Sequence, residues 1–185
     1  MGALAFIRDH PPLEARVNTS TIDTQFGPFT AVVDDDGAVL ASGWTADPGE
    51  LLPLIHPHLR SASDARPRPD LGAVTRAVRA YHVGDLHAID DVLVRQHSGG
   101  VFLAAAWKTL SEVEPGHPVT YTELAARTGN SAANRAAAQA CARNAAALFV
   151  PCHRVVRVGG SVSGFRWGPE IKRQLLAHES AAIGN

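Results

Sequence analysis

Cysteine and long apolar runs are scarce in this sequence. Only two of the 185 residues are cysteines, Cys141 and Cys152, so neither a disulfide framework nor a multi-cysteine zinc site is available. No stretch reaches about 18 consecutive apolar residues, and residues 1–16 carry acids and prolines where a signal peptide needs an apolar run. We therefore expect a cytoplasmic protein without membrane association, metal or cofactor, and we expect it to act as a monomer.

The chain also lacks an overall excess of charge, since its formal net charge is −1. The two halves nevertheless differ, because residues 1–93 hold seven Lys and Arg against 13 Asp and Glu, whereas residues 94–185 hold ten against five. A basic half joined to an acidic half predicts that only the second meets a polyanion such as nucleic acid. A solvated basic face without function would have the same composition.

Patterns in the first half predict a small β-sheet. Two β-prone runs, 29–33 and 38–41, flank the turn-forming cluster Asp34–Gly37 and indicate a hairpin. The stretch 60–70 is rich in Pro, Ser and charge and is expected to be a loop, and helical spacing follows over 71–81. We take residues 1–93 as an N-terminal domain and residues 94–185 as a C-terminal domain.

The second half is mainly helical in its spacing. An apolar face that includes Val101 and Leu110 predicts a buried helix over 101–110, which Pro115-Gly116 ends. Thr120 and Glu123 have the spacing of a capping box, so a helix should begin between them, at Tyr121. The expected fold class is therefore α+β, a small β-sheet domain followed by a helical one.

Two short helices around a glycine make a helix-turn-helix candidate of the winged-helix kind. The first runs to about Thr128 and breaks at Gly129, and the second starts after Asn130 or Ser131 and continues toward Arg143. The second helix is rich in alanine, which allows close approach either to DNA or to the core of the protein. Arg135, a long cation among these alanines, favours DNA.

A thiol follows a short apolar stretch. The β-prone run 148–150 stops at Pro151, and Cys152 is followed by His153 and Arg154. A free cysteine has a pKa near about 8.5, so a nucleophilic role needs a base or a nearby positive charge, and the adjacent residues offer both. The alternative is a small buried hydrophobic residue, which is also our interpretation of Cys141.

The sequence Pro151–Val156 resembles the active-site signature of the O6-alkylguanine-DNA alkyltransferases, also called methylated-DNA-protein-cysteine methyltransferases. Relative to the cysteine, the family has an asparagine eight residues earlier, an intercalating arginine 17 earlier and a tyrosine 31 earlier; here these are Asn144, Arg135 and Tyr121. A glutamate 27 residues later, in the last helix, corresponds to Glu179. The likeness extends over about residues 20–180 and is densest in the second half.

This resemblance implies repair of O6-alkylguanine, with O4-alkylthymine as a further candidate, by irreversible single-turnover transfer of the alkyl group to Cys152. By the same likeness, Glu179 orients His153, which removes the thiol proton through a water molecule. Asn144 would tie the helix-turn-helix to the active-site loop. Without the resemblance, Glu179 is a solvated charge and Asn144 a helix C-cap.

The implied partner is double-stranded DNA that contains the alkylated base. The target atom is inaccessible in a duplex, so the nucleotide must rotate out, and Arg135 would fill the vacated stack. Tyr121 would lie against the rotating phosphate and offer its hydroxyl to the flipped base; otherwise it is a core tyrosine. Lys172 and the loop 162–167 would close over the base. The DNA-binding residues that the resemblance implies are Arg135, Tyr121, Ala136, Ser131 and Lys172.

Three departures from the family pattern are visible. Ala145 stands where many members have proline, and the loop Ser163–Gly168 differs from the tyrosine and small residues of other members, which leaves the range of alkyl groups open. No cysteine precedes Cys141, so the zinc site of some members' N-terminal domain is not available.

Two other classes of function remain open. A cysteine hydrolase could use Cys152, His153 and Glu179, although adjacent Cys and His side chains rarely reach one substrate carbonyl together. A winged-helix DNA-binding protein without alkyl transfer would account for residues 121–143.

Overall fold

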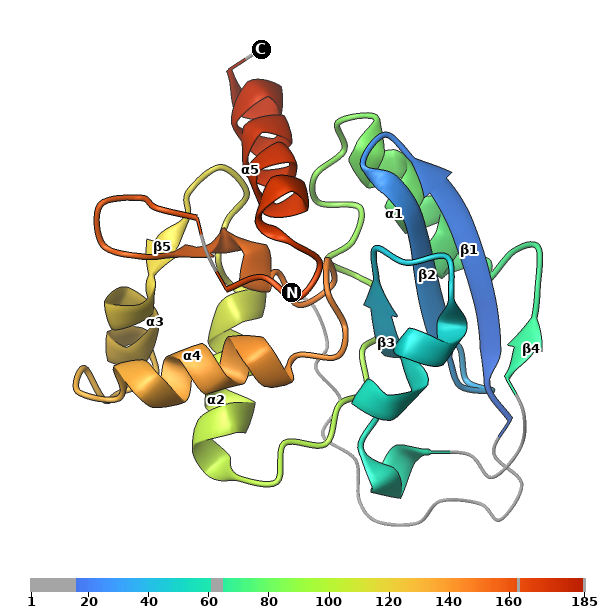
Figure 1. Cartoon of the computed structure of the whole chain (residues 1–185), viewed down its shortest axis with the longest axis horizontal. Helices are drawn as coiled ribbons and strands as arrows, with labels where there is room; N and C mark the ends of the chain where they lie inside the picture. The colour runs from blue at the N-terminus through green and yellow to red at the C-terminus, as the bar shows by residue number, and fades with distance from the viewer. Residues whose placement is uncertain (1–15, 61–64, 163, 185) are drawn as a thin grey trace. The chain divides into compact units, whose positions relative to one another are not determined.

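The computed structural model describes residues 16–60, 65–162 and 164–184. They divide into two compact units. The first unit holds the described residues up to His97 together with Ala145–Phe149, and the second holds Ser98–Asn144 and the described residues from Val150 onward. The chain has an α+β fold, with the larger sheet in the first unit and most helices in the second (Figure 1).

A four-stranded sheet with strand order β3-β2-β1-β4 forms the first unit. Its strands are β1 (Asn18–Thr24), β2 (Gly27–Val33), β3 (Val39–Gly43) and the two-residue β4 (Arg66–Pro67). The first three are antiparallel neighbours, and β4 pairs parallel with β1. Every residue of β3 is buried, although β3 is an edge strand of this sheet.

The predicted hairpin is confirmed. The Asp34 carboxylate accepts the backbone N–H groups of Asp36 and Ala38, both at 3.0 Å, which holds the turn between β2 and β3. The expectation of a plain loop over 60–70 is wrong in part, because β4 lies there; residues 61–64 fall outside the described part of the chain. β1 has no alternating apolar pattern and was not predicted.

Helix α1 (Ala73–His82) confirms the helical spacing in the first half. It covers one face of the sheet, and the short 3-10 turns between Pro48 and Leu59 cross the other (Figure 1). Apolar residues from both layers, among them Leu51, Val78 and Tyr81, are 0% exposed. β2 is thus buried on both faces over most of its length, which explains its largely apolar sequence.

The second unit is a helical unit with one small sheet. Its elements are α2 (Val101–Ser111), β5 (Val119–Thr120), α3 (Tyr121–Arg127), α4 (Asn134–Arg143), β6 (Val155–Val156) and α5 (Pro169–Ile183). β5 and β6 pair in parallel. No helix in the described part of the chain combines the length and the hydropathy needed to cross a bilayer.

The helix-turn-helix is formed by α3 and α4. The capping box is confirmed, because the Thr120 hydroxyl accepts the Glu123 N–H at 3.1 Å and the Glu123 carboxylate accepts the Thr120 N–H at 2.6 Å. α3 ends before Gly129, which has a φ of 87°. α4 begins at Asn134, later than predicted, because the Asn130 side chain accepts the Ala132 N–H at 3.1 Å and holds these residues in a turn.

Three further local predictions are corrected. The helix predicted over 101–110 is confirmed as α2, but it ends at Ser111, so Pro115-Gly116 does not end it. Val101 is 89% exposed at the start of α2 and does not extend its buried face. The run 148–150 is buried but not a strand, because Leu148 has a φ of 76° and turns the chain.

Candidate active site and DNA-binding surface

Cys152 lies in a 3-10 turn, Cys152–Arg154, that leads directly into β6. Because β6 pairs with β5, and β5 continues into α3, this turn is brought close to the start of the helix-turn-helix. Cys152 itself is buried, with 8% of its surface exposed. The nucleophile candidate therefore lies inside the fold.

Asn144 contacts the thiol directly. It caps the C-terminus of α4, and its side-chain nitrogen donates to Cys152 Sγ at 3.2 Å and to the Val150 carbonyl at 2.7 Å. The helix C-cap expected for Asn144 is confirmed, and its side chain also links the end of α4 to Cys152; its role in tying the helix-turn-helix to the active-site loop stays a prediction. A donor on sulfur favours the thiolate over the thiol.

The pKa of Cys152 is raised above its ordinary value by burial. The hydrogen bond from Asn144 and the positive charges of Lys172 and Arg166 oppose that shift without reversing it. Arg154, which the sequence suggested as the nearby positive charge, pairs with Glu179. The resting thiol is therefore protonated at neutral pH, and its use as a nucleophile requires a base.

His153 and Glu179 form a buried pair. Both are 0% exposed, and His153 Nε2 lies 2.8 Å from Glu179 Oε1. Glu179 also accepts from Arg154 Nε at 3.0 Å and from the Gly116 N–H at 3.3 Å. Arg154 in turn donates to the Val113 carbonyl. The pairing of Arg154 with Glu179 was missed from the sequence, and the solvated alternative for Glu179 is wrong.

The charge states within this network follow from burial and from Arg154. Burial alone would raise the pKa of Glu179, but His153 and Arg154 lower it below its ordinary value. Burial lowers the pKa of His153, and Glu179 offsets this only in part. We infer a neutral imidazole whose Nε2–H donates to the Glu179 carboxylate. Its Nδ1 is buried and has no hydrogen-bond partner among the described residues, so it remains available as a base.

Tyr121 is half-buried at the first position of α3. Burial, followed by the nearby Cys141 and Cys152, raises the pKa of Tyr121 to about 12, so its hydroxyl stays protonated and can donate. A Cβ atom at Gly164 would lie 3.5 Å from this hydroxyl oxygen, which shows that the loop after β6 passes beside Tyr121. The interpretation as a plain core tyrosine does not fit a partly exposed side chain.

Lys172 does not fit the surface contact with DNA that the sequence led us to expect. It is 1% exposed, and its amine donates to the Val155 carbonyl. Its charge acts on the thiol of Cys152 instead. Cys141 is half-buried on α4, and burial raises its pKa, so it remains a thiol with no assigned chemistry.

The outer face of α4 is open to solvent, whereas its inner face packs on α2. Ala137 and Ala140 are 0% exposed, and Trp107 Nε1 donates to the Ala140 carbonyl at 2.9 Å. Arg135 and Ser131 are exposed, and Ala136 is half-buried. Packing of the alanines in the core is therefore confirmed for Ala137 and Ala140, and their close approach to DNA on the exposed face stays a prediction.

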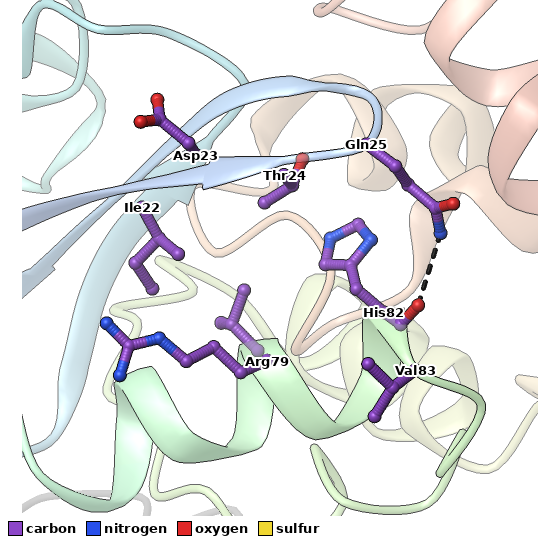
Figure 2. Close-up of a pocket in the computed structure, with 8 residues that line it drawn as sticks. Ile22, Asp23, Thr24, Gln25, Arg79, His82 and Val83 are labelled. Atoms are coloured by element: carbon purple, nitrogen blue, oxygen red, sulfur yellow. Dashed lines mark hydrogen bonds between the residues drawn. The ribbon is translucent and has the colours of Figure 1, made fainter.

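A separate pocket of about 300 Å³ lies in the first unit, between the end of β1 and the end of α1. Figure 2 shows Asp23, Gln25 and His82 around it, with the Gln25 amide donating to the His82 backbone carbonyl at 3.3 Å. None of the predicted site residues lines this pocket. Within the described residues no cluster of His, Cys, Asp and Glu could hold a metal ion.

Comparisons with known proteins agree with this geometry. Residues 101–181 match the family described as 6-O-methylguanine DNA methyltransferase, DNA binding domain. The chain is 30% identical over 165 residues to the methylated-DNA–protein-cysteine methyltransferase of Shigella flexneri, covering 89% of this chain and 96% of that protein. It is 45% identical over 82 residues to the regulatory protein ada of Salmonella typhimurium, but spans only 23% of that longer protein.

Solved structures show the same likeness over most of the chain. The Mycobacterium tuberculosis O6-methylguanine methyltransferase matches with a TM-score of 0.71 at 26% identity, covering 90% of this chain and 94% of that one. A structure of the M. tuberculosis protein in complex with DNA matches with a TM-score of 0.70 over 89% of this chain. From the residues around Cys152 and from relatives matched along nearly their whole length, this chain belongs to the methylated-DNA–protein-cysteine methyltransferase family.

Proposed function

We propose that this protein repairs O6-alkylguanine in double-stranded DNA by moving the alkyl group onto Cys152. The observation that carries the proposal is a buried thiol that receives a hydrogen bond from Asn144. The next residue in the chain, His153, is paired with the buried Glu179. The sulfur attacks the alkyl carbon, a carbon–sulfur bond forms, and the bond from that carbon to O6 of guanine breaks. Guanine then leaves as an anion and takes up a proton from water, while the proton lost by the thiol is held on His153 until solvent removes it, so the protons balance.

The thiol proton needs a base, because burial keeps Cys152 protonated at rest. His153 supplies that base through Nδ1, and Glu179 holds the ring by its other nitrogen. We propose one water molecule between the thiol and Nδ1, since the unpartnered nitrogen is a polar group that a water would satisfy. Tyr121, whose hydroxyl stays protonated, donates a hydrogen bond to the departing base.

Access to the base requires rotation of the nucleotide out of the duplex, at a cost of a few kcal/mol that is smaller for a mispaired alkylated base. Arg135, exposed near the start of α4, fills the vacated stack. Ser131 and Ala136 lie against the DNA backbone, and the loop 164–167 covers the flipped base. O4-alkylthymine carries the alkyl group on an equivalent exocyclic oxygen, and we propose it as a second substrate.

The reaction is stoichiometric and irreversible. A thioether is a poor leaving group toward water, and no second thiol is available beside Cys152 to remove the alkyl group, since Cys141 is raised in pKa by burial. Each molecule therefore repairs one base.

Mass measurement of the intact protein after incubation with O6-methylguanine duplex DNA tests this proposal. One added methyl group per protein, mapped to Cys152, is expected, with titration reaching a plateau near equimolar DNA. Cys141→Ser should behave like the wild type, whereas Cys152→Ser should gain no methyl group. Many turnovers, a label on Cys141, or ester hydrolysis without alkylation would reject it; DNA binding without any transfer would favour the DNA-binding alternative.

A further inference from the structure

Two segments from distant parts of the sequence form hydrogen bonds along the free edge of strand β3. Val39 donates to the Leu93 carbonyl at 2.8 Å and accepts from the Arg95 N–H at 2.9 Å. Further along the strand, Ser42 forms a parallel bridge with Ala146. Residues 145–149 belong to the first unit for this reason, although Asn144 and Val150, on either side of them in the chain, belong to the second.

Ser42 holds this segment with three hydrogen bonds. Its N–H donates to the Ala145 carbonyl at 2.8 Å, its carbonyl accepts from the Ala147 N–H at 3.3 Å, and its hydroxyl donates to the Ala147 carbonyl at 2.8 Å. Ser42 is 0% exposed, so these bonds are not exchanged with water. Gln96 adds a fourth, because its side-chain oxygen accepts the Ala145 N–H at 2.8 Å.

The held segment contains a backbone conformation that needs support. Leu148 has a φ of 76°, the one positive φ of a non-glycine residue in the described part of the chain, and the residue is fully buried. Such a conformation is unfavourable for a residue with a Cβ atom and persists only where the surroundings fix it. The hydrogen bonds of Ser42 and Gln96 on the preceding residues provide that support.

The two ends of the segment lead to the reacting group. Asn144 precedes it and donates to both Val150 and Cys152, and Val150 follows it two residues before the thiol. Any slack in residues 145–149 would change the separation between the Asn144 amide and the sulfur, because the chain between them is short. A hydrogen bond weakens steeply with such changes in distance and angle.

We propose that Ser42, with Gln96 as a second anchor, is a positioning residue for alkyl transfer, because it fixes the segment that sets Asn144 against Cys152. The role rests on the proposed function. Through it, a residue of the first unit would affect the rate of alkyl transfer without contacting the substrate. Loss of the Ser42 hydroxyl should loosen the Asn144–sulfur bond and disfavour the thiolate.

The test compares Ser42→Ala with Thr30→Val, both in a Cys141→Ser background. Thr30 is also 0% exposed and its hydroxyl donates to a buried backbone carbonyl, that of Thr45 at 2.6 Å, but it makes no bond to residues 145–149. Ser42→Ala should slow alkylation of Cys152 by free O6-benzylguanine about tenfold at neutral pH, with less loss at high pH. Thr30→Val should lose stability in urea but keep the wild-type rate.

A second pair of variants covers the case in which Ser42→Ala does not fold. Gln96 is half-buried, which leaves room for a substitution. Gln96→Glu keeps an oxygen that can accept from the Ala145 N–H, whereas Gln96→Ala removes it. The alanine variant should be slower and the glutamate variant close to the wild type. Equal rates in all four variants, or equal slowing by Ser42→Ala and Thr30→Val, would overturn the proposal.

A labelling reaction that needs no substrate distinguishes failure of the proposed function from failure of the positioning role of Ser42. Iodoacetamide labels a thiolate, so the pH midpoint for labelling of Cys152 reports its ionisation directly. The midpoint should rise in Ser42→Ala and Gln96→Ala but not in the two controls. A wild type that gains no alkyl group from DNA or benzylguanine rejects the proposed function, while the labelling midpoints still decide whether Ser42 positions the thiol.

Discussion

Acidification from pH 7.5 to 5.5 tests whether His153 is neutral in the folded protein. The ring is 0% exposed, and burial lowers its pKa despite the neighbouring Glu179 carboxylate. In the unfolded chain, a histidine takes up a proton near pH 6.5. Below that pH the unfolded state binds a proton that the folded state does not, so folding stability must fall as the pH falls.

The size of the effect follows from linkage. If His153 stays neutral in the folded state down to pH 5.5, one unfolded histidine with a pKa of about 6.5 removes about 1.4 kcal/mol between pH 7.5 and 5.5. Glu179 does not contribute in this window, because its pKa is lowered from an ordinary value that already lies below it. The other histidines are common to the wild type and to a His153→Gln variant.

Urea unfolding of both proteins at pH 7.5 and 5.5 measures the difference. The wild type should lose about 1.4 kcal/mol more than His153→Gln on acidification, whatever the two stabilities are at pH 7.5. A wild type that gains stability relative to the variant would mean that the imidazolium–carboxylate pair is the folded form at these pH values. His153 would then be unable to accept the thiol proton, and the relay would be wrong. An equal loss would mean that burial does not lower the pKa of His153, and the expected neutral ring would lose its support.

Three further outcomes are expected. Glu179→Ala should destabilise the fold by about 3–5 kcal/mol in urea, because Arg154 is 2% exposed and would be left as an unpaired buried charge; a loss typical of a surface ion pair would contradict the buried network. Arg135→Ala should slow repair of duplex DNA far more than reaction with free O6-benzylguanine, which needs no flipping, and equal losses in the two rate measurements would reject its role in the stack. Methylation of Cys152 should lower the melting temperature by an amount equivalent to about 1–3 kcal/mol, since the sulfur is packed 3.2 Å from Asn144; an unchanged melting temperature would show that the pocket has room.

Local signals in the sequence predicted the elements that local bonds define. The capping box at Thr120 and Glu123 and the turn at Asp34 are formed by side chains that bond within a few residues, so their spacing is sufficient. β1 is different, because it is buried by β2, β4 and α1 and carries no alternation of its own. Leu148 was predicted as part of a β-prone run because nothing near it in the sequence marks its turn; the residue before it is bonded by Ser42, more than 100 residues away.

The site was predictable only in part. The resemblance named Cys152, Asn144 and Glu179, and the structure brings the first two into contact. It could not show that Arg154 pairs with Glu179, because that contact depends on how α5 packs. Helical periodicity held an unused signal: Lys172, Leu175 and Glu179 are spaced as one face of α5, and all three are buried. From that spacing, Glu179 and Lys172 would both have been predicted as buried, and Lys172 would not have been assigned to DNA.

The buried charges around Glu179 are better explained by chemistry than by stability. A buried ion pair can often be replaced by apolar residues of the same volume without loss of stability, so the Arg154–Glu179 contact is weak evidence for a stabilising role. It keeps Glu179 ionised, however, and an ionised carboxylate only accepts hydrogen bonds. His153 must then donate from Nε2, which leaves the lone pair on Nδ1. A neutral amide at position 179 could donate as well as accept and would select neither tautomer. In the proposed mechanism, Arg154 would therefore support His153 as the base by keeping the residue that orients it ionised.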